Sequence, residues 1–234
     1  MWGGRLRSRT SLAPLPSPFL DSDATSCFRR TWGPQPDAEG HVTRKPKGYV
    51  GTNHETIGSD ILAVLAAVPT SAAILGEETV SRIANLRPDG WYPIAMLLEP
   101  MQMISDRLGR FALLEIGRKL FNLSHEQRLK QHTARSAADV VYGIDRMYRH
   151  ANRGTGIGGW RVLRFVPGEA VLEKTTPHHC VMEEGILAEA LIAVGVPALV
   201  RQSECLLKGA EACRYVITSS ITDERWSGGK PPMP

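Results

Sequence analysis

The chain has 234 residues, of which 42% are hydrophobic and 22% are charged, and its formal net charge is +4. These values allow one hydrophobic core of about 150–180 residues, so we expect one domain with tails. No basic cluster marks the predicted domain and no apolar signal-peptide segment opens the chain. We therefore expect a cytoplasmic protein that binds neither nucleic acid nor a membrane.

The first 46 residues differ in composition from the rest of the chain. They hold six of the sixteen prolines, seven basic and four acidic residues, and no apolar periodicity. Such a segment cannot bury enough apolar surface to offset the entropy of ordering it. We predict a disordered basic leader over residues 1–46, a single domain over residues 47–220 and a flexible tail over residues 221–234.

Apolar periodicity and capping residues predict a helical first half of the domain. A short apolar helix over Ser59–Val68 has a buried strand as its alternative, and Trp91, Tyr92 and Pro93 open a longer helix. Pro100 lies inside the apolar pattern of that helix and predicts a kink or break there. The remaining predicted helices cover Glu77–Leu86, Gly109–Leu123 and a segment between a Ser136 cap and a Gly154 stop.

The glycine run "GTGIGG" at residues 154–159 resembles a phosphate-binding loop only in composition. It precedes the predicted strand "WRVLRFV", whereas a phosphate loop must open a helix whose amides hold the anion. A hairpin turn at Pro167 and Gly168 then leads into "VLEKTT". The order of helices, hairpin, helix and hairpin predicts an α+β fold, with helices packed on a twisted antiparallel sheet.

Two methionines of the helix after Pro93, Met96 and Met101, suggest a pocket between that helix and the sheet. Methionine at helical spacing more often fills an irregular core, because its thioether side chain is flexible. A pocket lined by these residues would accept a small apolar or aromatic ligand.

Three cysteines in the last third of the chain are the strongest chemical signal. Cys205 and Cys213 flank Gly209 symmetrically in a predicted hairpin, and a positive φ at Gly209 would place the two thiols opposite each other. Cys180 begins an apolar helix, and a helix N-terminus favours thiolate. Three thiols and one further ligand suit tetrahedral zinc. Buried reduced thiols and a Cys205–Cys213 disulfide are the alternatives.

The stretch from "HHCVMEEGILAEALIAVG" to "VRQSECLLKGAEACRYVI" resembles the end of a 4-vinyl reductase type domain, over about Trp91–Thr218. The matching positions are Cys180, Gly185, Glu204, Cys205, Gly209 and Cys213. The resemblance implies a fold related to haem-nitric-oxide-binding and TRAPP-type domains. In the phenol-sensing activators with this domain, three cysteines and an acid three residues before the second cysteine hold zinc.

Here Gln202 occupies the position of that acid, so Glu204, His178 or His179 would have to supply the fourth zinc contact. Gln202 and Glu204 would face away from Cys205 unless the strand contains a bulge. Three thiolates and a fourth protein ligand leave no open position for water, so we expect structural zinc. By spacing to Cys180, Trp160 lies near the pocket tryptophan of the phenol sensors.

These features favour a sensory or regulatory domain for a small apolar or aromatic ligand, acting as a homodimer or through a partner protein. An enzyme or accessory factor in tetrapyrrole reduction, a haem-based gas sensor and a TRAPP-like scaffold are the alternatives. The chain shows no G-x-S-x-G or H-E-x-x-H motif, which lowers the expectation of catalysis. Candidate haem ligands are His125, His132 and His150.

Overall fold

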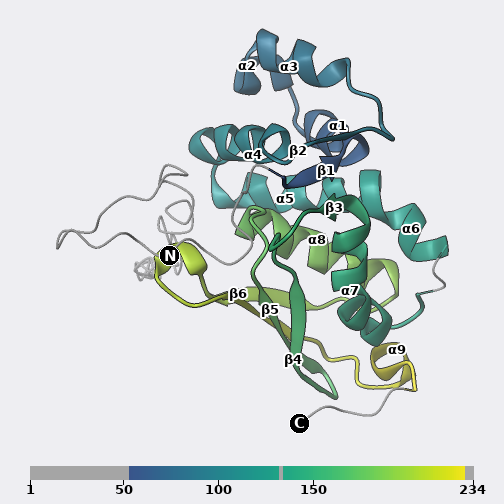
Figure 1. Cartoon of the computed structure of the whole chain (residues 1–234). Coiled ribbons are helices and arrows are strands. Elements are labelled where there is room, and N and C mark those ends of the chain that lie inside the picture. Colours follow the sequence, from purple (N-terminus) through teal and green to yellow (C-terminus); the bar gives the residue numbers. More distant parts are fainter. Residues whose placement is uncertain (1–52, 132–133, 230–234) are drawn as a thin grey trace, which may run out of the picture.

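The computed structural model describes residues 53–131 and 134–229. The predicted leader over residues 1–46 and the candidate haem ligand His132 lie outside this range. The helices are α1 (Gly58–Ala67), α2 (Ser71–Leu75), α3 (Glu77–Ala84), α4 (Ala95–Arg107), α5 (Arg110–Leu120), the π-helical segment η2 (Phe121–His125), α6 (Glu126–Gln131), α7 (Ala137–Ala151), α8 (Cys180–Ala193) and α9 (Glu224–Ser227) (Figure 1). The strands are β1 (Glu55–Ile57), β2 (Trp91–Pro93), β3 (Asn152–Arg153), β4 (Trp160–Val166), β5 (Glu169–Lys174), β6 (Leu199–Glu204) and β7 (Cys213–Thr218).

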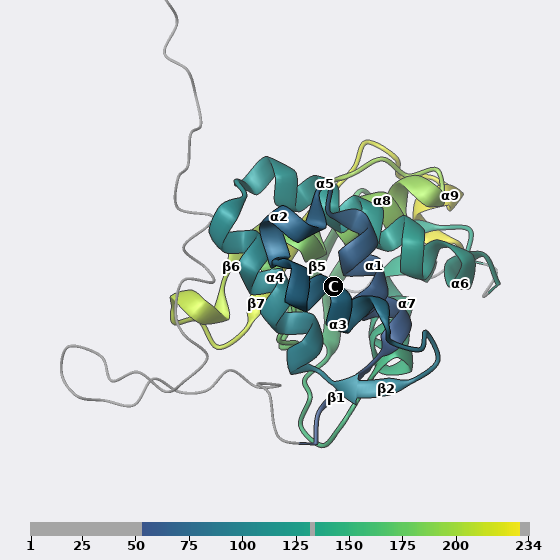
Figure 2. The same ribbon diagram turned by 90° about the horizontal axis from the view of Figure 1, so that it is seen from above.

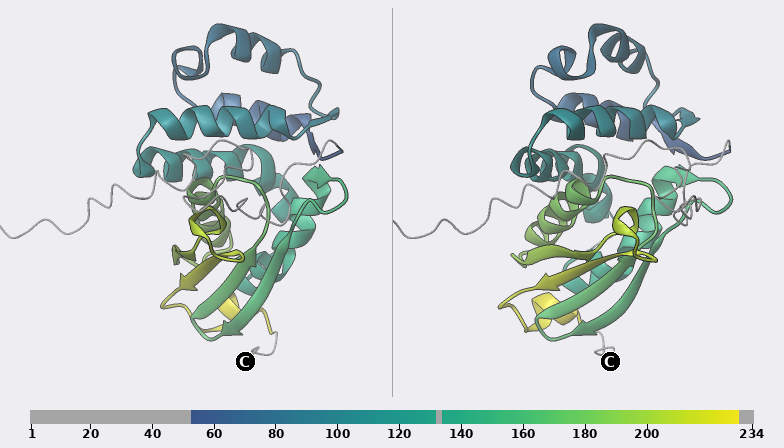
Figure 3. Two further views of the ribbon diagram at one scale, coloured as in Figure 1. Left: turned by 60° about the vertical axis from the view of Figure 1, so that its left-hand side comes forward. Right: turned by 90° about the vertical axis from the view of Figure 1, so that its left-hand side faces the viewer.

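The molecule is layered, with α2 and α3 at one end and the four-stranded sheet at the other (Figure 3). Between them lie α1 and α4, then α5, then α8, and from above these helices cover much of the sheet (Figure 2). Helix α8 packs on α5 and on β6. No helix among the described residues is both long enough and apolar enough to cross a lipid bilayer.

The larger sheet has the strand order β4-β5-β7-β6, and every pairing is antiparallel. Along β7, Cys213, Tyr215 and Ile217 are buried and the residues between them are more exposed. This alternation, which results from the two-residue repeat of a strand, gives the sheet one core face. The predicted α+β class with an antiparallel sheet is confirmed.

A small second sheet changes the predicted start of the long helix. Trp91–Pro93 is not helical but forms β2, which pairs antiparallel with β1, and helix α4 begins at Ala95. Trp91 and Tyr92 have an extended backbone because β1 satisfies their backbone hydrogen bonds. Sequence periodicity could not detect this partner, since it comes from a distant segment.

The predicted break at Pro100 does not end α4, which runs from Ala95 to Arg107 with Pro100 inside it. A proline removes its own N–H from the helical ladder, and its ring crowds the carbonyl four residues earlier. Leu97, Met101 and Ile104 are buried on the same helix. We attribute its continuity to this packing, which stabilises the turns on both sides of the proline.

Helix α7 begins as predicted, because the Ser136 Oγ accepts a hydrogen bond from the Asp139 N–H at 3.2 Å. The helix ends at Ala151, and the glycine run then turns the chain into β4, with φ of +136° at Gly154 and +72° at Gly156. The run precedes a strand, as the sequence predicts, so it does not present helix amides to an anion.

The predicted flexible tail after residue 220 is wrong for residues 221–229, which the structure describes. It contains α9, and the Trp226 side chain is 1% exposed and stacks on Phe165 at 5.3 Å between ring centroids. The Trp226 Nε1–H donates to the Val166 carbonyl at 2.8 Å. One tryptophan buries a large apolar area, which ties this short helix to the domain despite its Gly- and Pro-rich surroundings.

Candidate metal centre

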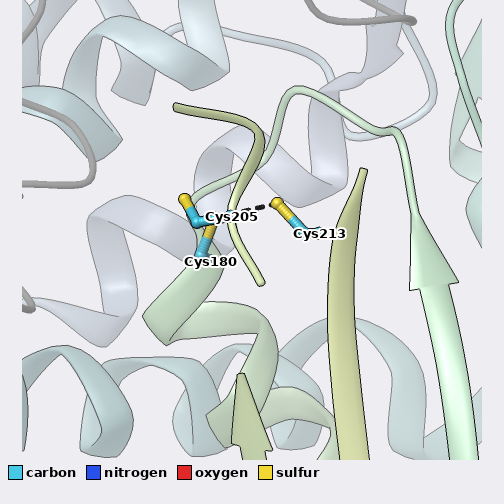
Figure 4. A group of neighbouring side chains, drawn as sticks. All are labelled: Cys180, Cys205 and Cys213. Carbon is cyan, nitrogen blue, oxygen red and sulfur yellow. Dashed lines mark hydrogen bonds between the residues drawn. The ribbon is translucent and has the colours of Figure 1, made fainter. Parts of the chain in front are cut away.

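Three thiols meet where the N-terminus of α8 approaches the end of the larger sheet (Figure 4). The sulfurs of Cys180, Cys205 and Cys213 all lie within 4.8 Å of one another, and the Cys180 Sγ to Cys213 Sγ distance is 3.6 Å. All three residues are buried, and none of them forms a disulfide. The predicted convergence of the thiols is confirmed.

The turn after β6 brings Cys205 to Cys213. Gly209 has a φ of +96°, the positive value that the sequence predicts, and it ends a short 3-10 turn over Leu206–Lys208. The Leu206 N–H also points at the Cys213 sulfur at 3.4 Å. Backbone N–H groups aimed at sulfur stabilise thiolate, so the turn adds a favourable electrostatic contact to the cluster.

Strand β6 contains the bulge that the sequence pattern required. Gln202 pairs with Tyr215 and Glu204 with Arg214, so the register shifts by one residue between the two pairs. Gln202 consequently shares a sheet face with the buried Tyr215. Its side-chain Nε2 is buried without a hydrogen-bond partner.

Glu204, a predicted metal ligand, lies on the other face of β6. Its carboxylate accepts a hydrogen bond from Arg214 at 2.8 Å, and its side chain is 43% exposed. Neither Glu204 nor His178 nor His179 belongs to the group of mutually close ligand atoms that the three sulfurs form. The structure thus places the three thiols together without any of the fourth ligands that we expected.

Lys174, at the end of β5, is a functional candidate that sequence reasoning missed. Its side chain is 0% exposed, its Nζ donates to the His178 carbonyl at 2.5 Å, and it lies 4.0 Å from the Cys180 sulfur. Ala170, Leu172 and Lys174 alternate along β5 and are all buried. That alternation in the sequence could have placed this lysine on the core face.

The electrostatics of the cluster favour a charged Lys174. Burial lowers the pKa of Lys174, but the acidic groups around it outweigh burial, with Cys180 the largest contributor, and the net pKa is raised. Hydrogen bonds with Cys180 and Cys205, together with burial, raise the pKa of Cys213. We infer that, without metal, Cys213 stays a thiol, while Lys174 stays an ammonium beside Cys180.

Two other buried acids near the start of α8 have their own partners. Glu183 Oε1 lies 3.2 Å from His178 Nδ1. Burial opposes ionisation of Glu183, but this hydrogen bond and Lys174 leave its pKa lowered. Glu184 forms an ion pair with Arg110 and accepts a hydrogen bond from the Gln202 N–H at 2.6 Å. These contacts give both acids a structural role in the first turns of α8.

His179 connects α8 to α4. It is fully buried, and its Nε2 lies 3.0 Å from the Ser105 Oγ, while its Nδ1 lies 3.5 Å from the Met182 backbone nitrogen. The neutral tautomer that fits both contacts accepts at Nδ1 and donates from Nε2. Burial is the main cause that lowers the pKa of His179 to about 4.

The predicted ligand-binding residues lie in two parts of the fold. Trp160, at the start of β4, is 8% exposed, and its ring lies 5.5 Å from that of Tyr215. Met101 is buried and Met96 is partly buried, both on α4, which packs on α1 and α2. A separate surface pocket of about 190 Å³ lies along α7; its lining residues include Tyr142, Arg146 and Met147. No residue of the predicted ligand set lines that pocket.

The thiol geometry fits zinc. Tetrahedral zinc with Zn–S bonds of about 2.3 Å holds its sulfurs about 3.8 Å apart, and the Cys180–Cys213 distance of 3.6 Å is close to that value. The sulfurs are soft ligands, which zinc prefers. Cys180, Cys205 and Cys213 would hold the ion.

The described histidines differ in the partners of their ring nitrogens. His54 Nε2 already contacts the Thr155 carbonyl at 2.7 Å, and both ring nitrogens of His179 have the partners given above. His178 uses Nδ1 for Glu183, and its Nε2 is buried without a hydrogen-bond partner. His150 is exposed near the end of α7, and His125 lies in η2. None of these five lines the pocket beside α7, whose volume is below the roughly 300–1,000 Å³ of typical ligand sites.

No protein-family model and no curated protein matches the chain. Among solved structures, the Fe(II) unliganded H-NOX protein from K. algicida is 13% identical and has a TM-score of 0.54 over 70% of this chain and 96% of that one. A mutant H-NOX domain from Shewanella oneidensis in the Fe(II)CO ligation state is 17% identical, with a TM-score of 0.50 over 69% of this chain and 98% of that one.

At these identities the likeness shows the fold alone, so the chain has an H-NOX-like α+β fold. The similarity of fold to haem-nitric-oxide-binding domains that the sequence resemblance implied is therefore seen in the structure. The narrower assignment to the 4-vinyl reductase type stays a prediction.

Proposed function

We propose that this chain is a sensory or regulatory domain for a small apolar or aromatic ligand, and that a structural zinc ion joins its sheet to α8. The observation that carries the sensory function is the fold, which is similar to H-NOX domains over nearly their whole length. The three converging thiols support the zinc. The change on ligand binding would pass to a partner protein or to a second copy of the chain.

The packing around Trp160 supports a connection between a ligand site and the thiols. The Trp160 ring packs on Tyr215, whose hydroxyl donates to the Cys180 carbonyl at 3.0 Å. On the other side, α4 carries Met101 and also Ser105, which contacts His179 immediately before Cys180. A ligand beside Trp160 would therefore act on the start of α8 through Tyr215, whereas a ligand beside α4 would act on it through Ser105 and His179.

Zinc would act here as a structural cross-link. Bound zinc supplies charge neutralisation and fixed tetrahedral geometry to the thiolates, and it opens no site for water once a fourth protein ligand is present. Gln202 is the candidate for that fourth contact, because the bulge places it on the sheet face of Tyr215, and Cys213 lies on the same face of β7. Its amide oxygen would be the ligand atom, since an amide nitrogen only donates hydrogen bonds. An amide oxygen is a weaker zinc ligand than a carboxylate, so we expect modest affinity.

A fluorescence and melting experiment tests the ligand proposal. Purified chain is titrated with monoaromatic compounds such as phenol, and both the melting temperature and the tryptophan emission are followed. A ligand at 100 times its Kd should stabilise the fold by about 2.7 kcal/mol. Trp160→Phe should remove the emission change, whereas Trp91→Phe should retain it. If no compound of the panel shifts the melting temperature, the ligand proposal is wrong.

A haem-based gas sensor is the second candidate, favoured by the Fe(II) and CO forms in which the similar H-NOX domains were solved. The contacts of His54 and His179 and the small volume of the pocket beside α7 count against it. Titration of the purified chain with hemin decides between the two: a sharp Soret band at one equivalent supports the gas sensor, and free-hemin absorbance argues against it. The same visible spectrum would detect a bound tetrapyrrole, as the alternative role in tetrapyrrole reduction requires.

A further inference from the structure

Lys174 is a buried ammonium without a carboxylate partner among the described residues. No Asp or Glu oxygen of the described chain lies within 4.0 Å of its Nζ, and its contacts are the His178 carbonyl and the Cys180 sulfur. An isolated buried charge is strongly unfavourable, so it needs a nearby charge of opposite sign. Within the part of the chain that the structure describes, the acidic side chain in contact with it is a thiol.

The neighbouring buried acids are already paired with other groups. Glu183 has His178 at 3.2 Å, and Glu184 has Arg110. Lys174 lies instead on the face of β5 that looks toward the cluster, since its register partner on β7 is Cys213. Glu183 still attracts Lys174 through space, so the acidic groups available to the ammonium are this carboxylate and the thiols of the candidate metal centre.

We propose that Lys174 is the counter-ion of the metal–thiolate centre, a positioning residue that favours three thiolates on one divalent ion. This inference rests on the proposed zinc site. Three thiolates and one Zn²⁺ carry one excess negative charge, which a single ammonium neutralises. Because the pair is buried, solvent screens this attraction little.

The same charge balance bears on the fourth ligand. A neutral ligand leaves the centre and Lys174 with no net charge, whereas a carboxylate would leave one uncompensated negative charge in a buried site. Gln202 on the thiol face and Glu204 on the solvent face match this requirement. The neutral glutamine and the charged lysine thus balance the charge of the centre together. Gln202→Glu should therefore lower the stability of the zinc-bound domain.

The test measures Zn²⁺ affinity by competition with a chromophoric chelator, using the full chain and its variants. Lys174→Met removes the charge and keeps most of the volume, and it should weaken Zn²⁺ binding by at least about tenfold. Lys174→Arg keeps the charge and should retain more affinity than Lys174→Met. Lys208→Met, an exposed lysine in the turn after Cys205, is the matched control and should leave the affinity unchanged.

Melting temperatures separate a counter-ion from a packing residue. With chelator present, Lys174→Met should lose little stability relative to the wild type, because the metal-free centre has no excess charge that depends on the ammonium. With zinc present it should be less stable than the wild type. Equal Zn²⁺ affinity in the two proteins, or an equal loss of stability with and without metal, would overturn the proposal.

The Zn²⁺ affinity of the wild-type chain distinguishes failure of the counter-ion proposal from failure of the zinc proposal. A wild-type chain that holds zinc, combined with an unaffected Lys174→Met, rejects the counter-ion and leaves the zinc proposal in place. A folded wild-type chain that binds no zinc rejects the zinc site and the counter-ion together. Co²⁺ substitution checks the ligand set, because thiolate-to-cobalt absorption should be weaker in the lysine variant at equal metal concentration.

Discussion

Gly185 of α8 lies against Gly117 of α5 so closely that a Cβ on Gly185 would come within 3.0 Å of the Gly117 Cα and 2.2 Å of the Leu114 carbonyl oxygen. The two helix backbones touch at this point, because neither glycine has a side chain to hold them apart. Since α8 begins with Cys180, the crossing also sets where the thiol cluster meets the helical layers.

Gly185→Ala should therefore destabilise the domain by about 1–3 kcal/mol or more, because the contacted atoms are backbone and cannot move aside. Gly143→Ala, inside α7, is the control: an added Cβ there meets only an Arg146 nitrogen at 3.9 Å, and better helix propensity should add up to about 1 kcal/mol. Urea unfolding of both variants checks the opposite signs. Equal stability of Gly185→Ala and wild type would show that the helices separate freely.

Trp226 should anchor the C-terminal segment. Trp226→Ala removes a nearly fully buried indole that stacks on Phe165, and we expect a loss of about 3–5 kcal/mol. Trp226→Phe should cost less, since it keeps the stacking and loses the hydrogen bond to Val166. Thermal unfolding of the two variants tests the order, and a negligible effect of Trp226→Ala would return residues 221–229 to the status of a tail.

Acid should destabilise the domain through His179. The pKa of this residue is about 4 when folded and about 6.5 when unfolded, so the unfolded chain binds more protons between these values. The stabilising contribution is complete above pH 6.5 and is lost as the pH falls toward 4, at a total of about 3 kcal/mol. Denaturant unfolding in the presence of chelator measures the slope.

His179→Asn keeps a good N-cap at the start of α8 and has no group that titrates in this range. Its stability should depend less on pH between 4 and 6.5 than that of the wild type. The same acid slope in both proteins would mean that other groups cause it. His150→Asn, at an exposed site on α7, is the control and should keep the wild-type slope.

Removal of zinc should loosen the hairpin after Cys205 and the first turn of α8 together. Metal binding and folding are coupled where a site forms only in the folded state. Hydrogen exchange should therefore rise in Leu206–Lys208 and in the first turn of α8 on chelation, with little change in α3. Cys205→Ser should behave like the chelated wild type, and addition of zinc should not restore its melting temperature. Unchanged exchange in both segments would leave the thiols as ordinary core residues.

Local signals in the sequence were sufficient for several elements. Ser136 caps α7, Gly209 takes a positive φ, and Cys180 begins α8, because caps and left-handed turns depend on residues close in the chain. The order of these elements predicted the α+β class. The sequence also showed that Gln202 and Cys205 could share a sheet face only if β6 contained a bulge, because side chains alternate between the two faces of a regular strand.

Contacts between distant segments were decided only by the tertiary structure. Trp91–Pro93 became a strand because β1 pairs with it, and Trp226 became a core residue because Phe165 and Val166 lie beneath it. Glu204 forms an ion pair with Arg214 and does not face the thiols. Lys174, which belongs to no sequence motif, lies 4.0 Å from the sulfur of Cys180. Residue types and spacing determined that three thiols could meet. The sheet register decides that the Lys174 ammonium faces the thiols, because register sets the distance between the charged groups. Burial decides how strongly these charges interact.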